Sequence, residues 1–295
     1  MADRLRSPSG WSVLPLFGLL LIGGAGGCAL FSEPVTLGRV NKIPALRPPP
    51  DAVALDIVFV ERPEGDPLLG PELWSHVDEV GSLPLETRNI LRENGLRVGI
   101  VGSRPPVALQ TLLGLQADFA AEPGAEERKA LVGRQIMLRS GGETEIQTTP
   151  FLEQCRVEVK LGDVVKPREY ITARGMLRVT VQREQDGWVR LEFTPRVQHG
   201  RHQLRHAVGE GGWQFASTQN AESFHNQRFG VTLGMGEMAI LSSHGGETPD
   251  LGRLLFTGPS DTAPIQRLLI VRLCDMHNAQ DPFADSLANV AAASP

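Results

Sequence analysis

The sequence lacks several residue patterns that define functional classes. It has only 3 cysteines among 295 residues. This number excludes a disulfide-rich scaffold, and because no cysteine lies in a CxxC pair, redox catalysis has no support. Lys and Arg total 29 against 34 Asp and Glu, for a net charge of −5. There is no basic excess to neutralise phosphates, so nucleic acid is not expected as a partner.

Long hydrophobic runs and catalytic motifs are also missing. The apolar stretch near the N-terminus covers residues 13–22, which is shorter than the roughly 20 residues that span a bilayer. No Walker A, GxSxG or HExxH pattern occurs, and no Ser/His/Asp or Cys/His arrangement follows from local spacing. We therefore expect neither an enzyme nor a cofactor.

Glycine and proline, by contrast, are abundant, at 32 and 22 residues. This abundance favours turns and short strands over long helices. The hydrophobic share of 41% is enough for a sizeable core. The length suits about two domains.

The first 28 residues have the layout of a secretory signal. Arg4 and Arg6 precede the apolar stretch 13–22, and small residues 25–27 lead to Cys28. A positive segment, a short apolar segment and small residues at the cleavage site form this pattern. The small residues directly before Cys28 resemble the lipobox of bacterial lipoproteins.

That resemblance implies that residues 1–27 are removed and that Cys28 carries lipid on its sulfur and on its new amino terminus, palmitate being one of the acyl chains. In Gram-negative lipoproteins an alanine after the cysteine, here Ala29, implies sorting to the outer membrane, facing the periplasm or the cell surface. Several acyl chains anchor a protein far better than one. The alternative is an ordinary secreted protein in which Cys28 occurs by chance.

The predicted fold class is α+β, with a small α+β domain followed by a larger, mainly antiparallel β domain of sandwich or barrel-like form. The predicted segments are a signal peptide (1–27), the lipid attachment with a proline-rich tether (28–51), the small α+β domain (52–116), a linker (117–130), the β domain (131–276) and a flexible tail (277–295).

Local patterns predict individual elements. Helical spacing of apolar residues predicts helices over 73–80, 84–93 and 105–115. Asp186-Gly187 predicts the turn of a β-hairpin. Residues 252–256 are expected to be a strand, and Gly234-Met235-Gly236 a hairpin turn or bulge.

Three histidines, His199, His202 and His206, are the nearest approach to a metal signature. Neutral imidazoles bind Zn²⁺ or Cu²⁺. On a strand, His202 and His206 share one face, with His199 in the preceding turn. Neighbouring arginines favour a basic, solvent-facing hairpin, so no metal is expected. The alternative function is an exported metal-binding or ligand-binding protein, or a hydrolase, that uses these histidines.

Ser103 and Arg104 lie where a predicted strand runs into a predicted helix. Helix N-termini favour anions, and a hydroxyl and a guanidinium would add to such a site. Pro105 and Pro106 remove two amide donors from the first turn. We therefore favour an ordinary turn with a serine cap over an anion site.

Two further groups of residues have two interpretations each. Cys155 and Cys274 either pair or remain separate thiols, and we favour the thiols. The aromatic residues of the C-terminal half are expected to pack in a core. The alternative is a binding platform that contains Trp213 and Phe215.

Two stretches resemble known families. Residues 194–197 (TPRV), Gly236-Glu237 and the apolar residues 238–241 are similar to the β-domain of bacterial secretins. The segments ERPEGD, ELWSHVDE and RENGLRVGIVG are similar to uncharacterised bacterial envelope lipoproteins. Together with Cys28 these resemblances imply a non-enzymatic, membrane-anchored envelope protein that binds another envelope protein or helps to assemble a secretion or surface structure.

Overall fold

The computed structural model describes residues 51–115, 131–185, 187–209, 212–259 and 264–276, except for the side chains of 131–132 and 202–218. All of them fall within one compact unit. The elements, in chain order, are β1 (Ala52–Pro63), η1 (Pro67–Leu69), α1 (Pro71–Trp74), α2 (Leu85–Glu93), β2 (Leu96–Val101), α3 (Val107–Leu112), β3 (Leu131–Arg139), β4 (Glu143–Gln147), β5 (Leu152–Leu161), β6 (Val164–Gln185), β7 (Trp188–Gly209), β8 (Gly212–Ser223), η3 (His225–Gln227), β9 (Phe229–Gly234), β10 (Met238–Ser243), α4 (Leu251–Phe256), β11 (Thr257–Gly258) and β12 (Ile265–Met276).

The first sheet has the strand order β2-β10-β12-β1-β3, with β11 paired to β12. Successive side chains on a strand point to opposite faces, and here both faces are apolar. On β12, Leu269, Val271 and Leu273 belong to the core shared with the second sheet. Leu268 and Ile270 belong to a second core beneath the helices. The central strands are therefore buried from both sides.

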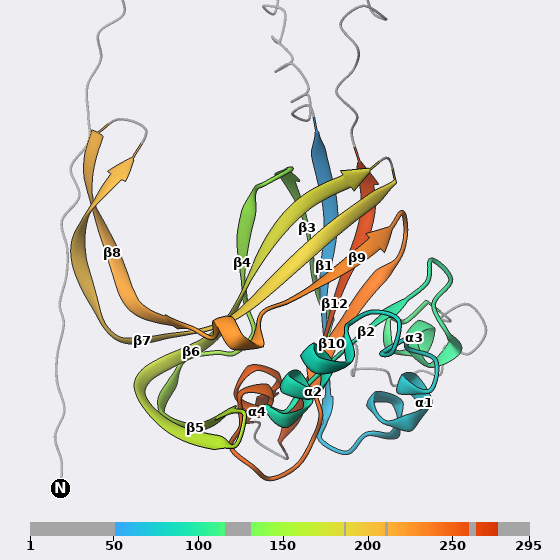
Figure 1. Cartoon of the computed structure of the whole chain (residues 1–295), viewed down its shortest axis with the longest axis horizontal. Coiled ribbons are helices and arrows are strands. Elements are labelled where there is room, and N and C mark those ends of the chain that lie inside the picture. The colour runs from blue at the N-terminus through green and yellow to red at the C-terminus, as the bar shows by residue number, and fades with distance from the viewer. Residues whose placement is uncertain (1–50, 116–130, 186, 210–211, 260–263, 277–295) are drawn as a thin grey trace, which may run out of the picture. The chain divides into compact units, whose positions relative to one another are not determined.

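A layer of short helices covers the far face of the first sheet. Leu73 and Trp74 of α1 and Leu109 of α3 are buried in the second core, together with Ile240 and Ile270 from the strands. Helices α1 and α3 lie at the right of Figure 1, next to the sheet strands. The order of layers is helices, first sheet, second sheet.

The second sheet contains β4, β6, β7 and β8 in that order, with β5 on β6 and β9 on β7. Val179, Val181 and Leu191 are completely buried against the first sheet. The rings of Phe193 and Phe229 stack with centroids 5.1 Å apart. The larger, mainly antiparallel β part that the sequence predicts is thus confirmed, as two open sheets.

The pairing of strands crosses the predicted domain boundary. β1 and β2 come from residues 52–116, yet β1 pairs with β12 and β2 pairs with β10. These strands share a sheet with the last strands of the chain and form no sheet of their own. The alternation of apolar residues predicts a strand but does not show which distant strand lies next to it. The predicted division into an α+β domain and a β domain is therefore only partly supported.

Three local predictions need correction. The helix expected over 73–80 ends after one turn at Trp74, because Asp78 forms a β-bridge with Ile100. Residues 252–256, predicted as a strand, belong to helix α4. The Asp250 carboxylate caps this helix by accepting a hydrogen bond from the backbone amide of Arg253 at 2.8 Å.

The third correction concerns the turn at Met235. It is not a hairpin turn, since β9 and β10 lie in different sheets. Instead it is a crossover, and Gly236 has a φ of +80°. β6 and β7 pair up to Gln185 and Trp188, as the predicted hairpin requires, and Gly187 has a φ of +86°. Asp186 lies outside the described residues.

β7 and β8 continue beyond the second sheet as a two-stranded ribbon. β6 pairs with β7 only as far as Gln198, and β9 only as far as Phe193. Beyond these residues, among the described strands, β7 has β8 as its one neighbour. We call residues 199–209 and 212–220 the ribbon. It extends at the left of Figure 1.

Candidate functional site

The histidine cluster is only partly within the described side chains. His199 lies within β7 and not in a turn, because the strand continues through a bulge between His199 and Gln203. Its ring lies 5.0 Å from that of Tyr170. The side chains of His202 and His206 lie outside the described part. Within the described part, no three His, Cys, Asp or Glu residues group together as a metal site would require.

Tyr170 and Glu222 form a polar contact beside His199. The Tyr170 hydroxyl donates to a Glu222 carboxylate oxygen at 2.9 Å, and Arg168 donates to the other oxygen at 3.1 Å. Burial raises the pKa of Tyr170, and the hydrogen bond to Glu222 adds to the shift. These contacts join the β5–β6 hairpin to the base of the ribbon.

Ser103 and Arg104 are both exposed in the loop between β2 and α3. The helix cap is Pro106, and no side chain bonds to the first turn. The predicted serine cap is therefore wrong. A helix of 6 residues whose first amides follow two prolines makes a poor anion site.

The two described cysteines are free thiols. Cys155 lies on β5 of the second sheet and Cys274 on β12 of the first. Burial is the main cause that raises the pKa of Cys155. Burial and a hydrogen bond with Asp56 raise the pKa of Cys274 to about 11. Both thiols thus resist ionisation, which disfavours a nucleophilic role.

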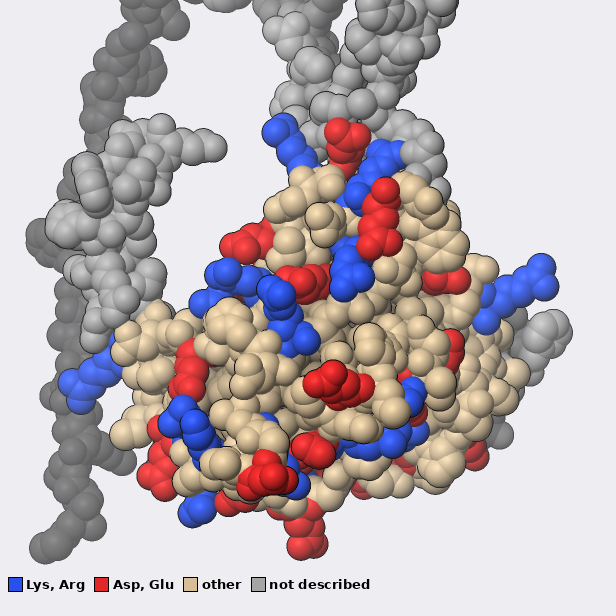
Figure 2. Space-filling model, in the orientation of Figure 1, with Lys and Arg blue, Asp and Glu red and all other residues tan. Residues whose placement is uncertain are grey.

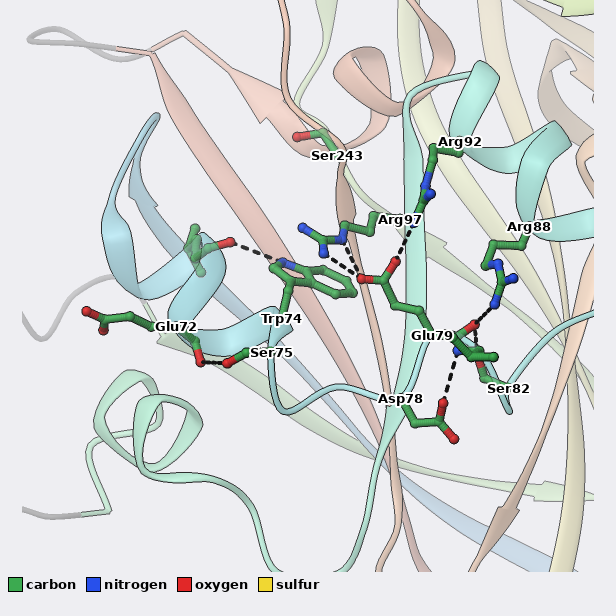
Figure 3. Close-up of polar contacts among 12 residues, drawn as sticks. Glu72, Trp74, Ser75, Asp78, Glu79, Ser82, Arg88, Arg92, Arg97 and Ser243 are labelled. Carbon is green, nitrogen blue, oxygen red and sulfur yellow. Dashed lines mark hydrogen bonds and ion pairs between the residues drawn. The ribbon is translucent and has the colours of Figure 1, made fainter. Parts of the chain in front are cut away.

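Glu79 is the centre of a polar network that the sequence did not reveal (Figure 3). One carboxylate oxygen accepts from Arg97 at 2.8 Å and the other from Arg92 at 3.1 Å. The backbone oxygen of Glu79 accepts from Arg88 and from Ser82, each at 3.2 Å. The oxygens of this one residue therefore bind three arginines: Arg88 and Arg92 from α2 and Arg97 from β2.

Arg97 also stacks on Trp74. The guanidinium carbon is 4.1 Å from the centroid of the indole ring, a geometry suited to a cation–π interaction. The indole nitrogen donates to the Leu69 oxygen at 3.1 Å. Figure 3 shows the ring held between this bond and the arginine.

Beside Trp74 and Arg97 lies an open depression of about 680 Å³. Its wall includes Ser75, Ser243 and His244. Burial is the main cause that lowers the pKa of His244, and the positive charges of Arg97 and Arg92 add to the effect. The imidazole is therefore biased toward its neutral form.

The hydroxyl groups of Ser75 and Ser243 on the wall of this depression are hydrogen-bonded to groups other than His244. Ser75 donates to the Glu72 oxygen at 3.2 Å, and Ser243 accepts from the Gln266 amide at 3.2 Å. The depression has a mixed lining of apolar and polar side chains, and the serines described on its wall bond to groups other than His244. Neither of these two hydroxyls is hydrogen-bonded to His244, the arrangement by which a histidine activates a serine.

Charges of both signs alternate over the surface. The face drawn in Figure 2 carries blue and red side chains next to one another. Several form pairs, such as Arg228 with Glu192 at 3.3 Å and Arg178 with Glu143 at 3.4 Å. Exposed pairs of this kind contribute little to stability.

Cys28 lies outside the described residues, as does the predicted tether. Among the residues that are described, no helix combines the length and the hydrophobicity required to cross a membrane.

Trp213 and Phe215 lie on β8, but their side chains are not described. Phe193, Phe224, Phe229 and Phe256 are buried, as the core interpretation predicts, whereas Trp188 is 40% exposed.

The described residues define a mainly antiparallel β protein with two open sheets and short helices. No protein-family model matches the chain, and no curated protein matches it. Among solved structures it is similar to one described as the type II secretin GspD from enteropathogenic Escherichia coli, at 14% identity and a TM-score of 0.19. The match covers 81% of this chain and 69% of that chain. A likeness at this level carries no argument about function.

Proposed function

We propose that the chain is a non-enzymatic envelope lipoprotein, anchored through Cys28, with a structural or assembly role of the kind that secretin-like proteins have. The N-terminal sequence supports the anchor, because a positive segment, a short apolar segment and small residues lead directly to Cys28. The body supports the assembly role through the shape of its second sheet.

The two-stranded ribbon is the feature that best supports the assembly role. An isolated two-stranded hairpin is marginally stable in water. Residues 199–209 pair only with β8 among the described strands, so the ribbon leaves two edges of backbone N–H and C=O groups without strand partners. Such edges are sites where another chain adds a strand. A partner that pairs with these edges would stabilise the ribbon.

The anchor is tested by replacing the lipidated residue. Cys28→Ser should release the protein from membranes into the soluble envelope fraction, because the thioether to the lipid cannot form. Cys155→Ser serves as the matched control and should leave the protein with the membranes. Membrane retention of Cys28→Ser equal to that of the wild type would contradict the anchor.

The assembly role is tested by shortening the ribbon. Residues 200–219 are replaced by Asn-Gly, which joins His199 to Asn220 through a two-residue hairpin turn; these two residues are opposite each other in the register. After cross-linking in intact cells, the wild type should appear in complexes larger than the monomer. The shortened variant should appear as the monomer, with an unchanged melting temperature of the body. Complexes of the same size from both proteins would contradict the role of the ribbon.

A further inference from the structure

Two large side chains, Trp188 and Met235, are exposed at the end of the body where β1 begins. We call this end the entry face and define it by Asp51, Ser140, Trp188 and Met235. Ser140 donates its amide to the Asp51 oxygen at 3.3 Å, and Arg183 pairs with the Asp51 carboxylate at 3.5 Å. The turns that follow β3, β6 and β9 all reach this end.

Strand pairing places Trp188 and Met235 together on the entry face. Trp188 is opposite Gly234 in the register of β7 and β9, directly before Met235. The Gly236 amide donates to the Leu273 oxygen at 2.8 Å, close to the end of β12, and Met276 at that end is opposite Val53 of β1. The start of β1, the end of β12 and the turn at Met235 thus share one end of the molecule.

Both side chains are more exposed than their chemistry favours. Trp188 is 40% exposed and Met235 is 45% exposed. Tryptophan is enriched at membrane–water interfaces, because its ring is apolar and its N–H needs a polar neighbour. Methionine adapts its shape to irregular apolar surroundings.

Arginines and acidic residues surround these two side chains. Arg104 and Arg139 are exposed, and the Cβ of Ser103, next to Arg104, lies 3.1 Å from the position that a Cβ on Gly236 would take. Glu184 and Asp275 are exposed at the same end. The charges nearly balance, so apolar contact rather than net charge decides what this face binds.

The chain that precedes the body joins it at the entry face. If Cys28 carries lipid, residues 29–50 connect the membrane to Asp51. These 22 residues span at most roughly 75 Å even at full extension. β12 has 12 residues, so at about 3.3 Å per residue the opposite end of the body lies about 40 Å farther away. The tether therefore presents the entry face to the membrane at a high effective concentration, at which a contact too weak for free binding becomes populated.

From this juxtaposition we infer that the entry face rests on the lipid surface, with Trp188 and Met235 in the headgroup region and Arg104 and Arg139 near the lipid phosphates. The inference rests on the proposed anchor and adds an orientation to it. The β5–β6 turn and the loop before α4 then point away from the membrane.

The test measures which tryptophan lies near lipid. Mature protein with Cys155→Ser and Cys274→Ser is coupled at Cys28 to a maleimide phospholipid in phosphatidylcholine vesicles with brominated acyl chains, which quench nearby tryptophan emission. Chemical coupling makes the result independent of whether cells attach lipid to Cys28. Trp188→Phe in the same background should reduce the quenched fraction at least threefold. Equal quenching with and without Trp188, or no quenching in either protein, would overturn the inference.

A matched control places a tryptophan at the other end of the same strand. Val165 is 47% exposed near the start of β6, whereas Gln185 at the end of β6 is opposite Trp188. Val165→Trp added to Trp188→Phe should leave the quenched fraction at the level of Trp188→Phe alone. Quenching restored by the Val165 substitution would show that the body has no preferred face toward the lipid and would overturn the inference.

Discussion

The first sheet and the ribbon are built from strands of similar length but differ in what covers them. β12 is paired on both edges and buried on both faces, between the second sheet and the helices. The ribbon has one strand partner for each of its strands. Cooperative stability follows from buried apolar contacts, so the first sheet stabilises itself, whereas we propose that a partner chain stabilises the ribbon.

The largest expected effect comes from the core that the two sheets share. Phe193 is completely buried and stacks on Phe229. Phe193→Ala should lower the free energy of unfolding by about 3–5 kcal/mol, because it removes apolar contacts and leaves a cavity. Urea denaturation measures the change. In contrast, shortening the ribbon should change the same quantity by less than about 0.5 kcal/mol, and a loss comparable to that of Phe193→Ala would show that the ribbon is part of the cooperative body.

A smaller loss is expected at the contact between α2 and β5. Asn94 is completely buried; its amide donates to the Ile90 and Lys160 oxygens at 2.9 and 3.1 Å, and its oxygen accepts from the Lys160 amide at 2.8 Å. Asn94→Ala removes the acceptor of the Lys160 amide and the donor to Ile90, while the Lys160 oxygen keeps its bond from the Gln227 amide at 3.3 Å. The substitution should cost about 2 kcal/mol in chemical denaturation. Asn89→Ala, at an exposed position on the same helix, is the control and should lie within about 0.5 kcal/mol of the wild type.

The Glu79 network should contribute less, since the arginines reach solvent. Glu79→Gln keeps an acceptor for Arg97 and the backbone oxygen that binds Arg88, but it removes the charge that pairs with the guanidinium groups of Arg92 and Arg97. The free energy of unfolding should fall by about 1 kcal/mol at low salt, and the difference should shrink in 1 M salt because screening weakens the pairs. Glu93→Gln, at an exposed position, is the matched control. A loss that is independent of salt would indicate packing rather than charge as the cause.

The smallest effect is confined to high pH. The pKa of Cys274 is raised from 9.0 to about 11 in the folded chain. Between these values the unfolded thiol ionises while the folded thiol stays protonated, so stability is fully present below pH 9 and falls as the pH rises toward 11. Relative to Cys274→Ser, the wild type should lose thermal stability only in this window. A difference between the two proteins that does not vary with pH would contradict the raised pKa.

Patterns of short range were predictable from the sequence. The helix predicted over 84–93 corresponds to α2, and Gly95 just after it has a positive φ, +75°, which favours glycine at a helix end. The hairpin predicted around Gly187 agrees with the pairing of β6 and β7. Residues 252–256 were misread because a short, mainly apolar segment looks alike in a buried helix and a buried strand. The deciding signal was the Asp250 cap.

The long-range features were not predictable in the same way. The pairing of β2 with β10 joins residues far apart in the chain, and no local pattern records it. The Glu79 network combines α2, β2 and the loop between α1 and α2, so its members have no fixed spacing that defines a motif. Ser103 and Arg104 fit a local pattern, yet the loop leaves both exposed, because the helix after them begins only at Val107.

The body is stabilised by its own core, and we propose that a partner completes the ribbon. Hydrogen exchange of backbone amides tests it most directly, with purified protein compared to protein in its native membranes. In the purified protein the amides of residues 199–209 should exchange at least a hundredfold faster than those of β12, and in the membranes they should become protected while β12 is unchanged. Ribbon amides that are already as protected as β12 in the purified monomer would contradict the account.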